Sequence, residues 1–204
     1  MGFSPLFRDE TNTLFFTSLP DSEATAMFIG ERSDVMIRSL GKKKSKIDDS
    51  VFVSENAYLV GEIEIGRNSS IWPGAVLRAD RFRIQIGRNC SIQDNCVIHA
   101  GFSDVLIGDN VTVGHGSIIH GAQIGNNVLI GMHTTLGIFS EIGDDCMIGA
   151  HSMVKDYLKI PSKSLVMGVP ARIKRIVNRK EIERILAAAT FYVDLSREFK
   201  KRGL

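Results

Sequence analysis

The sequence is dominated by a six-residue period in its aliphatic residues. The period runs from Ile47 to Val154 and comprises eighteen hexads. Two extra gaps of three residues and one five-residue step interrupt the count without ending it. The residue after the aliphatic one is often Gly, and the fourth residue after it is small or β-branched. The aliphatic positions are Ile47, Val53, Leu59, Ile65, Ile71, Leu77, Ile86, Ile92, Ile98, Ile107, Val113, Ile119, Ile124, Ile130, Leu136, Ile142, Ile148 and Val154.

This period excludes an amphipathic helix, whose apolar positions recur at steps of three and four. Short strands joined by turns explain it, with the aliphatic residue pointing inward and the small residue fitting at a corner. Gly after the aliphatic residue eases the close approach of successive backbones. Three hexads complete one triangular coil, so the eighteen hexads predict about six coils. With roughly 4.8 Å between coils, we predict an all-β solenoid about 29 Å long.

A second pattern follows the repeat near the end of the chain. Asn178 can cap a helix, and Glu181 stands three residues later, as in a capping box. Apolar residues then recur at helical spacing, and the charged residues between them are expected to face solvent. We predict one helix from about residue 179 to residue 202, packed along the prism. Its apolar stripe comprises Ile182, Ile185, Leu186, Ala189, Val193 and Phe199.

These patterns divide the chain into three parts. Residues 1–35 are an N-terminal extension of uncertain order, residues 36–177 form the β-helix domain, and residues 178–204 form the helix packed on it. The extension contains six acidic side chains, which argues against a signal or transit peptide.

Composition narrows the function classes. A net charge of +2 is too small to favour a nucleic-acid partner, and no apolar run approaches the length of a membrane span. Cys90, Cys96 and Cys146 all occupy the small inward position of a hexad, so we expect buried free thiols rather than a disulfide or a thiolate zinc site. An odd number of cysteines without a secretory signal predicts a reduced, cytoplasmic protein.

Three histidines fall at positions that the period brings into relation. His99 and His120 each follow an inward aliphatic residue and are one full coil apart, so they are expected to stack on the same face. Two imidazoles there can share one metal ion. His115 belongs to the preceding face and cannot easily reach that ion within its own chain. A threefold assembly would let a neighbouring copy supply it, which predicts a homotrimer with three intersubunit metal sites.

The ligand set is typical of catalytic zinc, which takes three protein ligands and keeps an open position. His133 and His151 are expected to stack as well, on an outward turn. They lack a third candidate ligand, and we interpret them as surface residues.

Four segments resemble the gamma-class carbonic anhydrase family, and the resemblance runs from about residue 36 to the C-terminal helix. It implies a left-handed parallel β-helix with a C-terminal α-helix, assembled as a homotrimer. It also implies that His99, His115 and His120 bind zinc, with iron or cobalt as alternatives. The segments are Leu77–Asp80, Ser91–His99, Val113–Gly116 and Ile119–Gly121.

The resemblance also assigns roles to five further residues. It implies that Arg78 and Asp80 form an ion pair near the subunit interface, and that Gln93 and Asp94 lie beside the metal-bound solvent. Gln93 would orient hydroxide or substrate, and Asp94 would hold Gln93 or accept a proton. Tyr192 resembles a helix tyrosine of the family that reaches the site, with a core or interface tyrosine as the alternative.

The implied reaction is the hydration of CO2. A metal lowers the pKa of its bound water to about 7, and metal-bound hydroxide then attacks CO2 to give bicarbonate. One departure concerns proton transfer, because some active members carry acidic shuttle residues on loops near the ligands. Here Arg81 follows Asp80, and Ala100, Gly101 and Phe102 follow His99. Metal binding is therefore better supported than fast turnover.

Two other functions stay open. One is a hexapeptide-repeat acyltransferase that uses coenzyme A, which shares the prism and the trimer but employs a histidine as general base without a metal triad. The other is a non-catalytic, metal-binding trimeric module. The three phased histidines favour the metal-dependent enzyme.

Overall fold

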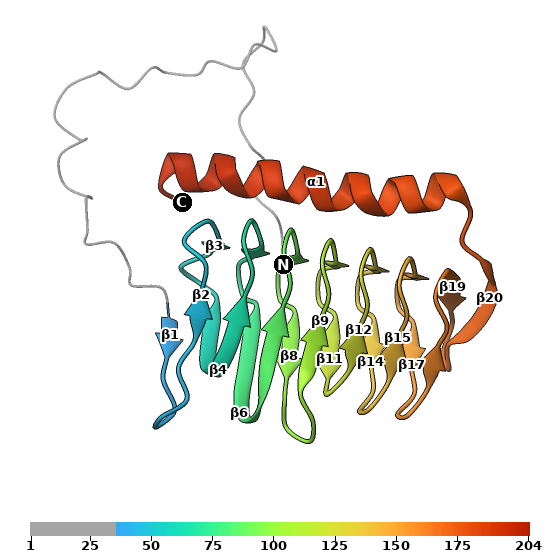
Figure 1. Ribbon diagram of the computed structural model, residues 1–204, viewed down its shortest axis with the longest axis horizontal. Helices are drawn as coiled ribbons and strands as arrows, with labels where there is room; N and C mark the ends of the chain where they lie inside the picture. The colour runs from blue at the N-terminus through green and yellow to red at the C-terminus, as the bar shows by residue number, and fades with distance from the viewer. Residues whose placement is uncertain (1–35) are drawn as a thin grey trace, which may run out of the picture. The chain divides into compact units, whose positions relative to one another are not determined.

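The computed structural model describes residues 36–204, which form coils stacked along one axis (Figure 1). Apart from the last strand, each strand pairs in parallel with its counterpart in a neighbouring coil, so the coils merge into continuous sheets. The stack has about seven turns. The predicted parallel β-solenoid is confirmed, and it is longer than eighteen hexads indicate. The reason is that Ile160 and Val166 are also buried and paired in register, which extends the period.

Two sheets build the coils. The larger has 12 strands and covers two faces, because β4 (Tyr58–Ile65) and β6 (Val76–Ile86) continue from one face to the next. Its other strands are β1 (Met36–Arg38), β2 (Lys46–Ile47), β8 (Val97–His99), β9 (Val105–Ile107), β11 (Ile118–His120), β12 (Gln123–Ile124), β14 (Thr135–Leu136), β15 (Glu141–Ile142), β17 (Met153–Val154) and β18 (Lys159–Ile160). The smaller sheet contains β3 (Phe52–Val53), β5 (Ser70–Ile71), β7 (Ser91–Ile92), β10 (Thr112–Val113), β13 (Leu129–Ile130), β16 (Met147–Ile148), β19 (Ser164–Met167) and β20 (Arg172–Ile176).

The three faces of the coil differ in what they present outward. The histidine face consists of β8, β11, β14 and β17 with the first halves of β4 and β6. The charged face consists of β2, β9, β12, β15 and β18, where Glu141 and Lys159 form an exposed ion pair of 2.9 Å. The helix face is the smaller sheet. The aliphatic residue of nearly every hexad is buried between these faces, as predicted.

The C-terminal helix α1 (Arg179–Arg202) lies along the helix face (Figure 1). Its N-cap is Asn178, which forms the predicted capping box with Glu181. Aromatic side chains join helix to sheet, because Phe199 packs edge-on against Phe52 and Trp72 with ring centroids 5.7 and 5.1 Å apart. The predicted helix is thus confirmed. The antiparallel strand β20, which the hexad period did not predict, connects it to the last coil.

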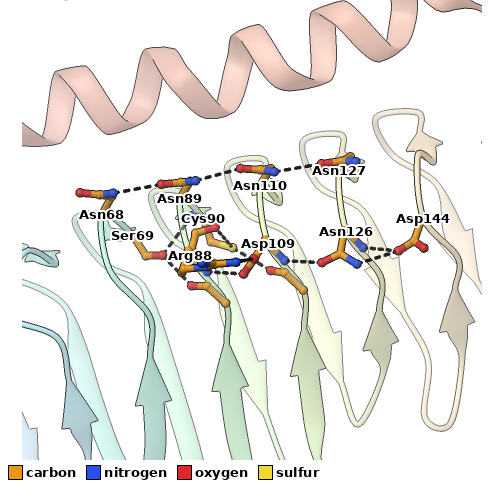
Figure 2. A network of polar contacts seen from close by, with 12 residues as sticks. Asn68, Ser69, Arg88, Asn89, Cys90, Asp109, Asn110, Asn126, Asn127 and Asp144 are labelled. Atoms are coloured by element: carbon orange, nitrogen blue, oxygen red, sulfur yellow. Dashed lines mark hydrogen bonds and ion pairs between the residues drawn. The ribbon is translucent and has the colours of Figure 1, made fainter.

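One corner of the coil is held by a ladder of asparagines (Figure 2). Asn68, Asn89, Asn110 and Asn127 all adopt the left-handed conformation, with φ between 55° and 60°. Asn tolerates this conformation better than most residues. Each Nδ2 donates to the Oδ1 of the next Asn at 3.0–3.2 Å, and Asn127 donates to Asp145. The side chains therefore connect five successive coils at this corner.

The three cysteines are free and buried, as expected from their place in the hexad. Among residues 36–204 no helix combines the length and apolar character needed to cross a bilayer. The extension predicted for residues 1–35 lies outside the described residues, and the division of the chain into three parts stays a prediction.

Candidate metal centre

His99 and His120 stack on the histidine face, as their spacing predicts. They end strands β8 and β11 and are direct partners in the parallel register. Their ring centroids are 5.0 Å apart, and the ring planes differ by 13°. The inward neighbours Ile98 and Ile119 are fully buried and fix both strands. The coil thus presents two parallel imidazoles side by side.

His120 lies in a half-buried setting that favours a neutral ring. Its Nε2 is buried and has no hydrogen-bond partner among the described residues. Phe102 covers the ring edge-on, with centroids 5.6 Å apart. Burial, and next the neighbouring His99, lower the pKa of His120 below its ordinary value. Neutral imidazole is the form that binds a metal, so this setting would suit a metal ligand.

His99 is held by the predicted pair of Arg78 and Asp80. Arg78 Nη1 contacts Asp80 Oδ2, Nε2 of His99 lies 3.1 Å from Asp80 Oδ1, and Nδ1 lies 3.2 Å from Arg78 Nη2. Burial opposes ionisation of Asp80, but the hydrogen bond from His99 and the charge of Arg78 lower its pKa on balance. Both nitrogens of His99 are therefore engaged, and one hydrogen bond must be released for the ring to bind a metal.

His115 lies at a different corner, between the helix face and the histidine face. Its Nδ1 is 2.9 Å from Asp94 Oδ2, and its backbone N–H donates to Oε1 of Gln93 at 3.0 Å. Gln93 is buried, with 4% of its surface exposed. Because Asp94 accepts the proton on Nδ1, Nε2 is the nitrogen left for a metal. Gln93 and Asp94 thus hold the third predicted ligand.

Tyr192 is the one predicted site residue that comes from the helix. It packs edge-on against Trp72, with ring centroids 5.9 Å apart. Burial, and then the charge of Asp94, raise the pKa of the Tyr192 phenol, while a hydrogen bond with Gln93 lowers it in part. The Tyr192 hydroxyl therefore lies close to the side chains of Gln93 and Asp94.

The donor set fits a transition metal only if more than one copy contributes. Across the described part of one chain, no three His, Cys, Asp or Glu side chains gather around a single point. The buried, unpartnered Nε2 of His120 and the Nε2 that Asp94 leaves on His115 are both suitable donors. Imidazole nitrogen suits zinc, iron and cobalt alike.

Two further residues lie near the pair, and the hexad period did not indicate them. Phe102 reaches His120 because Gly101 lets the loop pass directly over His99, where any Cβ would collide with the imidazole ring. Asp156 adds a negative charge that acts on His120. The Gly101–Phe102 sequence was a visible signal of a close turn, whereas Asp156 carried no signal because its carboxylate reaches back from a later coil.

The chain is similar to known proteins in sequence and in fold. The family model for bacterial transferase hexapeptide (six repeats) matches residues 104–138 and 121–156. The "Probable carbonic anhydrase" of Methanocaldococcus jannaschii is 43% identical over 151 residues, which cover 74% of this chain and 95% of that protein. Gamma carbonic anhydrase 2, mitochondrial, of Arabidopsis thaliana is 37% identical over 161 residues, covering 76% of this chain and 58% of the relative.

A solved structure has the same architecture. The hexapeptide transferase family protein from Anaplasma phagocytophilum superposes with a TM-score of 0.77 at 34% identity, covering 81% of this chain and 98% of that one. The matched region therefore spans nearly all of two relatives and somewhat over half of the Arabidopsis protein. From the identity and coverage of these matches, the chain belongs to the gamma-class carbonic anhydrase-like family of hexapeptide-repeat proteins.

Proposed function

We propose that this protein is a metal-dependent carbonic anhydrase-like enzyme that hydrates CO2 to bicarbonate at sites between the copies of a homotrimer. One observation carries the proposal: the carboxylate of Asp94 holds Nδ1 of His115 and leaves Nε2 as a donor. A carboxylate–histidine pair of this kind is the usual support of a metal ligand. The partner's His99 and His120, already stacked, supply the other two nitrogens.

Exposed apolar residues support assembly through the histidine face. Val97 and Ile118 point outward from β8 and β11 and are 38% and 44% exposed. Met153 continues the same outward row, and Met132 stands at the corner one coil beyond His115. Buried in a trimer, these side chains would contribute roughly 25 cal/mol for each Å² removed from water. The face that carries two ligands and the corner that carries the third are therefore both suited to meet another copy.

The residues around the histidines have separate tasks in this mechanism. A bound metal supplies a Lewis acid that makes a nucleophile from water near neutral pH. Gln93, fixed between the backbone N–H of His115 and the hydroxyl of Tyr192, orients a substrate oxygen. Arg78 and Asp80 hold the ring of His99. Phe102 provides an apolar wall beside His120, which suits a small non-polar substrate such as CO2.

Proton release is the step for which this site has the fewest suitable side chains. Some family members carry acidic shuttle residues on loops near the ligands, whereas here Ala100, Gly101 and Phe102 follow His99. We therefore expect slow turnover with full metal occupancy, and zinc as the first metal to test.

The second candidate function is acyl transfer from coenzyme A. The similarity to the Anaplasma hexapeptide transferase favours it. Such an enzyme would use one histidine as a base and would need no metal. Acyl transfer by a metal-free preparation would therefore replace the first proposal.

A complementation experiment tests the intersubunit site. His115→Ala and His120→Ala are each expected to lose zinc while keeping the coil. Refolded together in equal amounts, they are expected to regain about a quarter of the wild-type zinc, because an intact site forms wherever the two kinds of subunit meet in the correct order. Glu141→Gln on the charged face is the control. No recovery on mixing would contradict a site shared between copies, and wild-type zinc in either single variant would contradict the ligand set.

A further inference from the structure

The corner that carries His115 continues into a second pair of histidines. His133 and His151 lie at this corner one and two coils further along, in register with Gly116, the residue after His115. Both are in the left-handed conformation, with φ of 54° and 55°. Their rings stack with centroids 5.1 Å apart and planes 15° apart, almost the geometry of His99 and His120. Both are exposed, and within residues 36–204 their ring nitrogens have no hydrogen-bond partner. Each neutral ring still has one N–H to donate.

The histidine face offers a carboxylate at the corresponding height. Gly137 occupies the place beside His120 in the next coil, because Leu136 pairs with Ile119. It has no side chain, and the carboxylate of Asp156 takes up that space, where a Cβ at residue 137 would collide with Oδ1. Oδ1 accepts the backbone N–H of Ile138 at 2.9 Å, so the carboxylate is fixed. Its Oδ2 has no partner among the described residues, and Asp156 is an exposed residue.

Aromatic residues beside this carboxylate are exposed as well. Phe139 and Tyr157 stack with ring centroids 5.2 Å apart, although both adopt the left-handed conformation that bulky residues rarely take. They are 41% and 71% exposed in the single chain. Exposed aromatic side chains of this kind are typical of a surface that another chain covers.

The height of each group along the coil axis relates the two corners. Rotation about a threefold axis parallel to the coil axis leaves the position of each group along that axis unchanged. If His115 lies between the partner's His99 and His120, the coils that follow His115 therefore lie opposite the partner's following coils. His133 and His151 lie one and two coils beyond Gly116, and the ring of His133 leans back toward Gly116 and so toward the coil of His115. The carboxylate of Asp156 lies between the coil of Gly137 and the coil after it, which are one and two coils beyond His120.

We propose that the stacked His133 and His151 of each copy bind the carboxylate of the partner's Asp156, as a second intersubunit contact next to the metal centre. The inference rests on the proposed function, since it uses the same threefold arrangement. In it, two histidines of one copy share one carboxylate of the next, and the aromatic pair covers the contact. Because Asp156 lies near His120, this contact also fixes the side of the metal site that carries His120. It therefore stabilises both the trimer and metal binding.

Matched variants test the contact without disturbing the corners. Asp156→Asn keeps the Oδ1 acceptor for Ile138, and the double variant His133→Asn/His151→Asn keeps a residue that tolerates positive φ. Each is expected to raise the trimer dissociation constant about tenfold in sedimentation equilibrium at fixed zinc. The triple variant is expected to be no weaker than either, because both changes remove the same contact. Glu141→Gln on the charged face is the control.

The outcomes separate this inference from the proposed function. Additive effects in the triple variant would overturn the contact. So would trimer dissociation constants of the variants that equal that of a zinc-replete wild-type trimer. Both results would leave the proposed metal site intact. A zinc-free monomer as the wild-type form would overturn both the contact and the metal site. Restored assembly in Asp156→Lys when it is combined with His133→Asp/His151→Asp would support the contact directly, since the carboxylates and the N–H donor have then exchanged corners.

Discussion

Nδ1 of His115 lies 2.9 Å from Oδ2 of Asp94, although the two residues come from different coils. Asp94 follows β7, and His115 follows β10, which pairs with β7 in parallel. The register of the smaller sheet therefore brings the carboxylate to the imidazole. Because the carboxylate accepts the Nδ1 proton, it determines that Nε2 is the nitrogen left as a donor for a metal.

Removal of this carboxylate is expected to weaken metal binding without unfolding the coil. Asp94→Ala should raise the zinc dissociation constant by about 10–100-fold, because the ring loses both its orientation and its negative partner. The zinc dissociation constant of Asp94→Asn should lie between those of Asp94→Ala and the wild type, since the amide oxygen of Asn still accepts a hydrogen bond. Chelator competition measures the constants, and Glu141→Gln is the control. An unchanged constant in Asp94→Ala would show that His115 is not a ligand.

Substitutions at two adjacent isoleucines are expected to affect folding and trimer assembly separately. Ile119 is fully buried in the coil, so Ile119→Ala is expected to lower the free energy of unfolding by about 2–5 kcal/mol. Ile118 points outward on the histidine face, so Ile118→Glu is expected to give monomers with an intact coil. Urea unfolding and sedimentation velocity distinguish the two effects. A trimeric Ile118→Glu variant would exclude this face from the interface.

Much of the fold follows from local repetition and was therefore predictable. A six-residue period fixes which side chains point inward, so it also fixes that His99 and His120 share a face and that Cys96 lies in the core. The capping box of Asn178 and Glu181 is equally local. The coil count fell short because it ended at Val154, although Ile160 and Val166 continue the six-residue step.

The surroundings of the site depend on contacts that no period describes. The hexad period leaves open whether the loop after β8 passes over His99 or away from it. The loop passes over His99 because Phe102 packs on His120. The carboxylate of Asp156 fills the space beside Gly137 only because Ile138 offers it a backbone N–H. Such contacts join side chains from different coils, and sequence spacing gives their height but not their direction.

The cysteines are expected to be unreactive in the folded protein. Burial raises the pKa of Cys90 to about 12 and that of Cys96 to about 11, and it also raises the pKa of Cys146. At pH 8 the reactive thiolate is therefore scarce in all three. A disulfide reagent should label no thiol in the native protein and three in urea. Fast labelling of the native form would place a thiol outside the core.

Attachment of the helix is expected to weaken in acid. The hydrogen bond from Arg175, and next the backbone N–H of Asn178, lower the pKa of Glu181 to about 2. Because this value is below that of the unfolded chain, the stabilisation is complete above about pH 5 and is lost as the pH falls towards 2. The difference in unfolding free energy between wild type and Glu181→Gln should therefore be largest at pH 7 and vanish near pH 2. Glu183→Gln, which removes an exposed pair with Arg179, is the control.

The asparagine ladder makes a prediction about the coil itself. Asn110 has a φ of 57°, accepts from Asn89 and donates to Asn127, each at 3.0 Å. Asn110→Ala should cost about 2–4 kcal/mol of unfolding free energy, because it strains a left-handed residue and leaves two amides unpaired. Asn110→Gly keeps the backbone conformation at no strain and should recover part of that loss. Asn56→Ala is the control, since Asn56 holds the same hexad position without positive φ and is exposed. Equal losses for Ala and Gly at 110 would assign the whole effect to the amide contacts, and equal losses at 110 and 56 would exclude a role for the ladder.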